Sequence, residues 1–221
     1  MTSTAIAAFF DFDQTLLEVE SGHMGIRMLR QKKMLPAGYF LKVWFANCLY
    51  QWQLLSEAGM ARVLLTYYRR RRLLAFEATA DDFYRTYLKP YLAPRIVARL
   101  EDHRRSGHLL VLISGSVRYM LEPVVHDLGF DRLFCTDLEV GRDGLLTGRS
   151  LGPICVDQAK QDYARQFAAE TGVDLTASFA YGNHPADLPM LEAVGYPHVV
   201  EPTRRLARIA ARRGWPVLSF R

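Results

Sequence analysis

Short apolar runs separated by longer amphipathic stretches form the basic pattern of this 221-residue chain. Residues 6–10, 109–113 and 177–181 are rich in apolar side chains, which is typical of parallel strands buried on both faces. Residues 133–134 and 197–200 predict two shorter strands. Apolar positions at helical spacing predict the connecting helices, over residues 94–106, 117–128, 156–171 and 203–213. Strands that alternate with helices predict an α/β fold with a doubly wound parallel sheet.

Glycine-containing turns punctuate this pattern. Ser114-Gly115-Ser116 is expected to end the second strand, and the loop 182–187 to end the third. Residues 138–149 contain three glycines and predict a hairpin or flap.

The pattern of residues 17–90 differs, because it is helical throughout. Helices are predicted over residues 20–33, 39–55 and 80–88, and Ser56 is a plausible N-cap for one more. The sequence therefore predicts a helical insert at 17–90, within a core domain made of residues 1–16 and 91–221.

Residues 39–55 form the most apolar stretch of the chain. It is interrupted by polar side chains and is shorter than the roughly 20 residues needed to cross a bilayer. A buried or ligand-facing helix is the preferred interpretation, and a helix lying in a membrane interface is the alternative. Its aromatic residues include Trp44, Phe45, Tyr50 and Trp52.

Composition indicates a folded protein, with 50% hydrophobic and 23% charged residues. The net charge of +5 comes largely from arginines at 69–72 and 204–213. These clusters lack interleaved aromatic residues and zinc ligands, which argues against a nucleic-acid partner. We expect them to form solvated helix faces.

Cysteine usage points to a reducing compartment. Cys48, Cys135 and Cys155 are odd in number and widely separated, as expected of free thiols in a cytoplasmic protein. The N-terminal apolar run has no basic residue before it and ends early at Asp11, so a secretory signal is not expected. Stable membrane insertion is not expected either.

Polar side chains follow the ends of all three principal strands. Asp11 and Asp13 follow the first, Ser114 the second and Asp187 the third. Because ligands of such sheets bind beyond the carboxyl ends of the strands, these residues should share one crevice. Two acids two residues apart point the same way from an extended backbone, and a metal could hold their charges together. This arrangement suits phosphoryl chemistry.

Four motifs together carry a family resemblance. They are Asp-Phe-Asp-Gln-Thr at 11–15, Leu-Ile-Ser-Gly-Ser at 112–116, Asp-Gln-Ala-Lys at 157–160, and Tyr-Gly-Asn-His-Pro-Ala-Asp-Leu-Pro-Met-Leu at 181–191. In this order and spacing the chain resembles the haloacid dehalogenase (HAD) superfamily of phosphatases. The similarity is greatest to the phosphoserine-phosphatase-like branch, subfamily IB, and covers nearly the whole chain.

The resemblance implies a role for each motif. Asp11 would be the nucleophile that forms an aspartyl-phosphate, and Asp13 the general acid and base. Ser114 and the Gly115 amide would hold phosphoryl oxygens, and Lys160 would neutralise charge there. Taken singly, these residues could equally be helix caps, a turn or a surface lysine.

The resemblance also implies a Mg²⁺ cofactor. The ligands would be the Asp11 carboxylate, the Asp13 carbonyl and the acids of the last motif. Asn183 stands where relatives usually have the first of those acids, whereas Asp187 is retained. An asparagine oxygen can bind Mg²⁺ but removes one negative charge. His184 is interpreted as a loop residue, since imidazole suits softer metals. Gln14 replaces the commoner glycine, at a position that varies among relatives.

The implied function is a magnesium-dependent phosphomonoester hydrolase acting on a small phosphorylated metabolite. Glu20 lies where phosphoserine phosphatases carry an acid that meets the substrate amino group, although it could simply begin a helix. Two alternatives stay open. Asn183 could mark a catalytically weakened phosphate-binding protein, and the aromatic insert could serve a larger, lipid-like phosphate ester.

Overall fold

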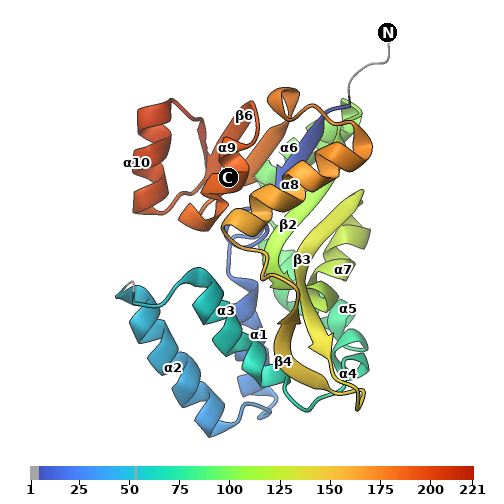
Figure 1. The fold of residues 1–221 in the computed structure, drawn as a ribbon, viewed down its shortest axis with the longest axis vertical. Coiled ribbons are helices and arrows are strands. Elements are labelled where there is room, and N and C mark those ends of the chain that lie inside the picture. Colours follow the sequence, from blue (N-terminus) through green and yellow to red (C-terminus); the bar gives the residue numbers. More distant parts are fainter. Residues whose placement is uncertain (1–4, 53) are drawn as a thin grey trace.

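The computed structural model describes residues 5–52 and 54–221 and contains a seven-stranded sheet (Figure 1). The strand order is β4-β3-β2-β1-β5-β6-β7, and every neighbouring pair is parallel except the antiparallel pair β3–β4. The strands are β1 (Ala7–Phe10), β2 (Leu109–Val117), β3 (Arg132–Val140), β4 (Leu146–Leu151), β5 (Phe179–Gly182), β6 (Tyr196–Val200) and β7 (Val217–Leu218).

Both faces of the central strands are buried, because successive side chains of β1 point to opposite sides of the sheet. Phe10 packs on one face against residues of α6 (Pro94–Arg105) and α7 (Arg118–Leu128). Phe9 packs on the other against residues of α8 (Gln158–Thr171), α9 (Leu188–Glu192) and α10 (Arg204–Arg213). Helices on both faces confirm the doubly wound α/β fold.

The segment between β1 and α6 is helical, as predicted. It contains α1 (Ser21–Gln31), α2 (Ala37–Gln51), α3 (Glu57–Leu65), α4 (Leu74–Glu77) and α5 (Ala80–Phe83), followed by a π-helical turn at Tyr84–Leu88. The Ser56 hydroxyl caps α3 by accepting a hydrogen bond from the Gly59 amide at 3.1 Å. The two segments that join this helical insert to the rest of the chain run side by side, since Leu17 and Leu92 form an antiparallel β-bridge. The predicted domain boundaries at 16/17 and 90/91 fall close to this bridge.

Several sequence predictions about strands were wrong. β2 continues through Ser114-Gly115-Ser116 to Val117, although its register with β3 shifts between Ile113 and Val117. β3 runs for nine residues, because its C-terminal half pairs with β4 to form the predicted hairpin. β7 and α9 were not predicted, since two-residue strands and single-turn helices carry almost no periodic signal.

Residues 39–55 were predicted to form a buried or ligand-facing helix, and the first of these two descriptions was wrong. In α2 only Ala46 is buried, whereas Phe40, Leu41, Trp44 and Phe45 are more than half exposed. Phe40 and Trp44 line a cavity, which is described below.

The prediction that the first arginine cluster forms a helix face was also wrong. Arg69–Arg72 lie in a turn after α3 rather than on a helix face, and the Arg71 guanidinium stacks on Tyr67 at 3.7 Å. The arginines of α10 do form a solvated helix face. No helix in the described part of the chain combines the length and the apolar character needed to cross a membrane.

Candidate active site

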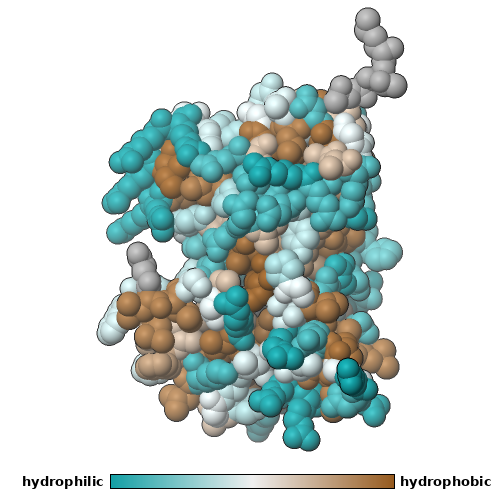
Figure 2. Space-filling model, viewed as in Figure 1, coloured by the Kyte–Doolittle hydropathy of each residue, from teal (hydrophilic) through white to brown (hydrophobic). Residues whose placement is uncertain are grey.

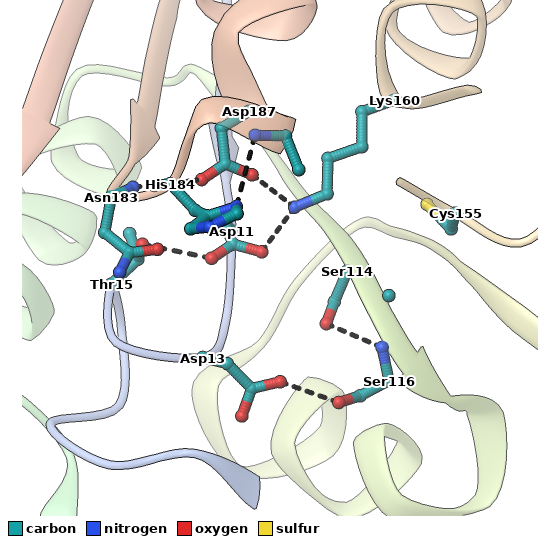
Figure 3. Close-up of polar contacts among 12 residues, drawn as sticks. Asp11, Asp13, Thr15, Ser114, Ser116, Cys155, Lys160, Asn183, His184 and Asp187 are labelled. Carbon is teal, nitrogen blue, oxygen red and sulfur yellow. Dashed lines mark hydrogen bonds and ion pairs between the residues drawn. The ribbon is translucent and has the colours of Figure 1, made fainter. Parts of the chain in front are cut away.

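The carboxyl ends of β1, β2 and β5 bring the predicted residues together (Figure 3). Asp11 directly follows β1, Asn183 and Asp187 follow β5, and Lys160 reaches in from α8. A cavity of about 440 Å³ lies over them, between the sheet and the helical insert. Its lining includes Asp11, Asp13, Glu20, Gly115, Lys160, Asn183 and Asp187. Ser114 is fully buried and lies beneath this surface.

Lys160 joins the two strand ends by contacting two carboxylates. Its Nζ lies 2.6 Å from Asp11 Oδ1 and 2.5 Å from Asp187 Oδ1, and all three side chains are buried. The second Asp11 oxygen accepts a hydrogen bond from the Thr15 hydroxyl at 3.0 Å. The second Asp187 oxygen accepts from the backbone amides of Asn183 and His184. The Asp11 carboxylate is therefore held in one orientation, facing the cavity.

This triad of buried groups carries excess negative charge. Burial and then the neighbouring Asp187 raise the pKa of Asp11 to about 7, against the lowering effect of Lys160. Burial alone would lower the pKa of Lys160, but the charges of Asp11 and Asp187 outweigh burial and raise it. Lys160 therefore stays protonated, and one positive charge faces two carboxyl groups.

Asp13 is oriented separately, at the base of the helical insert. Its Oδ1 accepts a hydrogen bond from the Ser21 amide at 2.5 Å, at the start of α1. Its Oδ2 accepts from the Ser116 hydroxyl at 2.7 Å. Asp13 thus links the first helix of the insert to the end of β2, and its carboxyl group is half-buried beside the cavity.

Glycines permit close approach at two positions around the triad. A Cβ on Gly182 would lie 2.6 Å from the Asp187 Cβ, a separation that real atoms do not tolerate. A Cβ on Gly115 would lie 3.0 Å from Val156. Beside it, the Ser114 hydroxyl accepts a hydrogen bond from the Ser116 amide at 3.1 Å. These contacts fix the end of β2 that lies beside the cavity.

Gln14 connects Asn183 to Glu20, a link that sequence reasoning missed. Its Nε2 donates to Glu20 Oε1 at 3.1 Å, and its Oε1 accepts from Asn183 Nδ2 at 3.0 Å. Because Glu20 is a carboxylate, the Gln14 amide must present its NH₂ group there and its oxygen to Asn183. The Asn183 Nδ2 is thereby engaged, and Asn183 Oδ1 accepts no hydrogen bond from the described residues.

The oxygen atoms present fit a hard divalent cation. Asp11, Asn183 Oδ1 and the Asp13 carbonyl are oxygen donors of the kind that Mg²⁺ prefers, and the triad has negative charge to spare. Within residues 5–52 and 54–221, no group of three or more His, Cys, Asp or Glu side chains is arranged to hold a metal. With Asn183 in place of an acid, this set of oxygen ligands has one carboxylate fewer than a site with an acid at that position.

The insert supplies the opposite wall of the cavity. Glu20 and Glu57 both face it, and the Tyr50 hydroxyl donates to Glu57. His184 lies 3.8 Å from Glu57, and its ring caps the turn at Pro185–Asp187, in keeping with a loop role. Burial raises the pKa of Glu20. His23 acts to lower this pKa, whereas the charges of Asp13 and Glu57 raise it further. Among the described residues, the cavity lining contains no arginine and one lysine, Lys160, which contacts Asp11 and Asp187.

Sequence reasoning did not single out Thr15, Ser21, Glu57 or Ser116, and it named Tyr50 only as one of the aromatic residues of the insert. Thr15 and Ser116 belong to the quoted motifs, so the motifs themselves carried a signal for them. Glu57 and Tyr50 are brought to the cavity by the packing of α2 against α3, which no local pattern encodes.

Comparison with known proteins places the chain in a family. The family model for haloacid dehalogenase-like hydrolases matches residues 8–192. "Inhibition of morphological differentiation protein" from Streptomyces azureus is 30% identical over 97% of this chain and 78% of its own length. Histidinol-phosphatase from Neisseria meningitidis serogroup C is 29% identical over 97% of this chain and 98% of its own length. Phosphoserine phosphatase SerB1 from Mycobacterium tuberculosis is 28% identical over 97% of this chain and 71% of its own length.

Solved structures agree. A crystal structure of a protein of unknown function from Bordetella pertussis Tohama I has a TM-score of 0.87 at 26% identity, covering 99% of this chain and all of that one. A substrate-bound phosphoserine phosphatase has a TM-score of 0.70 at 18% identity, covering 98% and 93%, and shares the fold. The chain therefore belongs to the haloacid dehalogenase-like hydrolase family, as a phosphatase of its phosphoserine-phosphatase-like branch.

Proposed function

We propose that the chain is a magnesium-dependent phosphomonoester hydrolase that works through an aspartyl-phosphate on Asp11. The observation that carries this proposal is the arrangement around Asp11. One of its oxygens contacts Lys160, the other contacts Thr15, and Asp13 lies beside the same cavity. A nucleophile, a cation for the phosphoryl oxygens and a proton donor thus meet at one surface.

The residues define a two-step reaction. An Asp11 oxygen attacks phosphorus, the bond from phosphorus to the ester oxygen breaks, and the Asp13 carboxyl group gives its proton to the leaving alcohol. Water then attacks the phosphorus, Asp13 takes a proton from it, and inorganic phosphate leaves with Asp11 restored. Lys160 and the Gly115 amide would bind the equatorial oxygens in both steps.

Magnesium would be held by Asp11, Asn183 and the Asp13 carbonyl, with Asp187 supporting the site through Lys160 and the loop amides. When bound, it would offset the repulsion between an anionic nucleophile and an anionic phosphate. Orientation of the Asn183 oxygen would come from Gln14, which engages the amide nitrogen.

The cavity favours a substrate that carries an ammonium group and no carboxylate. Glu20 and Glu57 offer negative charge for the ammonium, which extends the role expected of Glu20. A substrate carboxylate would meet these acids, and the part of the lining that the structure describes holds no arginine and no lysine beyond Lys160 to pair with it. An aromatic wall that includes Phe40 and Trp44 could pack against an apolar or cationic substrate body.

Two phosphate esters that differ only in a carboxylate test this proposal. Ethanolamine phosphate should be hydrolysed with at least about tenfold higher kcat/KM than phosphoserine, since an unpaired carboxylate costs more than about 1.4 kcal/mol. Release of inorganic phosphate would be followed with Mg²⁺ and with EDTA, and Asp11→Asn is the inactive control. Preference for phosphoserine would reject the substrate class, whereas Mg²⁺-dependent turnover by Asp11→Asn would reject the mechanism.

A further inference from the structure

Helix α2 presents an apolar surface to solvent on the outside of the insert. Leu41, Phe45 and Trp52 are 63%, 59% and 75% exposed. They are spaced four and seven residues apart, so they form one stripe along the helix and its C-cap. Figure 2 shows hydrophobic residues gathered over this outer edge, where Figure 1 places α2. The stripe differs from the residues of α2 that line the cavity, among them Phe40 and Trp44.

The chain segment that carries this stripe has a net positive charge. Residues 21–55 contain five lysines and arginines and no aspartate or glutamate. Arg30 lies in the last turn of α1, and Lys32 and Lys33 form the turn that follows it; all three are exposed. The same segment therefore joins exposed tryptophan and phenylalanine side chains to a net positive charge.

We propose that α2 docks the protein on an anionic lipid surface, with the Leu41–Phe45–Trp52 stripe in the acyl boundary and Arg30, Lys32 and Lys33 on the headgroups. Exposed aromatic residues beside lysines and arginines are the features that bind helices to membrane interfaces. With 15 residues the helix is about 22 Å long, too short to cross the roughly 30 Å hydrocarbon layer, so it would lie along the surface.

Charge complementarity distinguishes this partner from a second copy of the chain. A symmetric dimer through α2 would place two copies of a segment with five cationic and no acidic residues at one interface, and that segment offers no acid to neutralise the charge. An anionic bilayer instead neutralises the charge. Docking there would hold the cavity wall formed by Phe40 and Trp44 next to the membrane.

Vesicle sedimentation with the full chain tests the proposal. Vesicles of equal parts phosphatidylcholine and phosphatidylglycerol should bind the protein, whereas phosphatidylcholine alone should not. The triple variant Leu41→Ser, Phe45→Ser, Trp52→Ser and the triple variant Arg30→Gln, Lys32→Gln, Lys33→Gln should each lower the partition coefficient at least about tenfold. Both alter exposed residues outside the cavity lining, so turnover of a small phosphate ester should persist.

Helix α10 provides a matched control. It carries exposed Arg204, Arg205 and Arg208, but its apolar residues Leu206 and Ala210 are buried in the core. Replacing these three arginines with glutamine should lower binding less than threefold, if α2 rather than general positive charge docks the protein. Equal loss from the α10 variant, or no sedimentation of the wild type, would overturn the proposal. So would a dimer, detected by analytical ultracentrifugation, that the Leu41, Phe45 and Trp52 changes abolish.

Discussion

Lys160 is the residue on which the geometry of the site depends most directly. Its one ammonium group balances Asp11 and Asp187, which belong to segments 176 residues apart in the chain. Its removal would leave two carboxyl groups facing each other in a buried space, without a counter-charge. The two acids would then repel, or one would have to take up a proton.

Lys160→Met should therefore lower the free energy of unfolding by about 3–5 kcal/mol, as measured by urea denaturation at neutral pH. The double variant Lys160→Met, Asp187→Asn removes one of the two stranded charges and should regain part of that loss. Both variants should be inactive, because the phosphoryl oxygens lose their cation. A single variant as stable as the wild type would contradict this account of the triad.

Asn183 gives the site one carboxylate fewer than the usual family pattern. Asn183→Asp should tighten Mg²⁺ binding about tenfold, since a charged oxygen replaces a neutral one. Gln14→Gly in the same background removes the amide oxygen that would face the new carboxylate, and should tighten binding further. Isothermal titration calorimetry would measure both. A rise of about a hundredfold or more in kcat for Asn183→Asp would favour the alternative that the natural chain is a weakened phosphate-binding protein.

At the scale of elements, a histidine cluster joins α6 to the sheet. His103 on α6 is buried, with its Nε2 2.8 Å from the Tyr181 hydroxyl on β5 and its Nδ1 2.8 Å from His108 Nδ1. Burial, together with the charges of His108 and His198, lowers the pKa of His103 to about 4. The folded protein therefore favours the neutral ring.

Stability should fall as the pH drops from about 6.5 towards 4, because over this range the unfolded chain binds a proton that the folded chain excludes. One such proton contributes a slope of at most about 1.4 kcal/mol per pH unit. Thermal unfolding across this pH range should show a shallower decline for His103→Gln than for the wild type. His126→Gln, on the exposed side of α7, is the control and should leave the slope unchanged. Equal slopes in all three proteins would contradict the assignment.

At the scale of the whole molecule, the sequence predicted the architecture well, because the central strands are short apolar runs that alternate with amphipathic helices, a pattern typical of a buried parallel sheet. The sequence-based predictions failed where contacts between distant segments determine side-chain exposure or strand length. The exposed aromatic residues of α2 looked like core, since helical periodicity does not reveal which helices lack a partner. The continuation of β2 through Ser114-Gly115-Ser116 depends on β3 lying alongside it.

The candidate site followed the same division. Asp11, Lys160 and Asp187 could be named from the sequence, because each belongs to a short motif and the motifs occur in the order and spacing of the family. The link from Gln14 to Asn183 and Glu20 joins three segments by side-chain hydrogen bonds, and Glu57 reaches the cavity through the packing of α2 against α3. Neither arrangement leaves a local pattern in the sequence.

The central claim is that these segments fold around an Asp11 carboxylate that becomes phosphorylated. The most direct test traps this intermediate during turnover. The enzyme is mixed with a phosphate ester and quenched rapidly, the acyl phosphate is reduced with borohydride, and the modified peptide is identified by mass spectrometry. The account predicts reduction at Asp11 in the wild type and none in Asp11→Asn. Phosphorylation at another residue, or full turnover without any acyl phosphate, would contradict it.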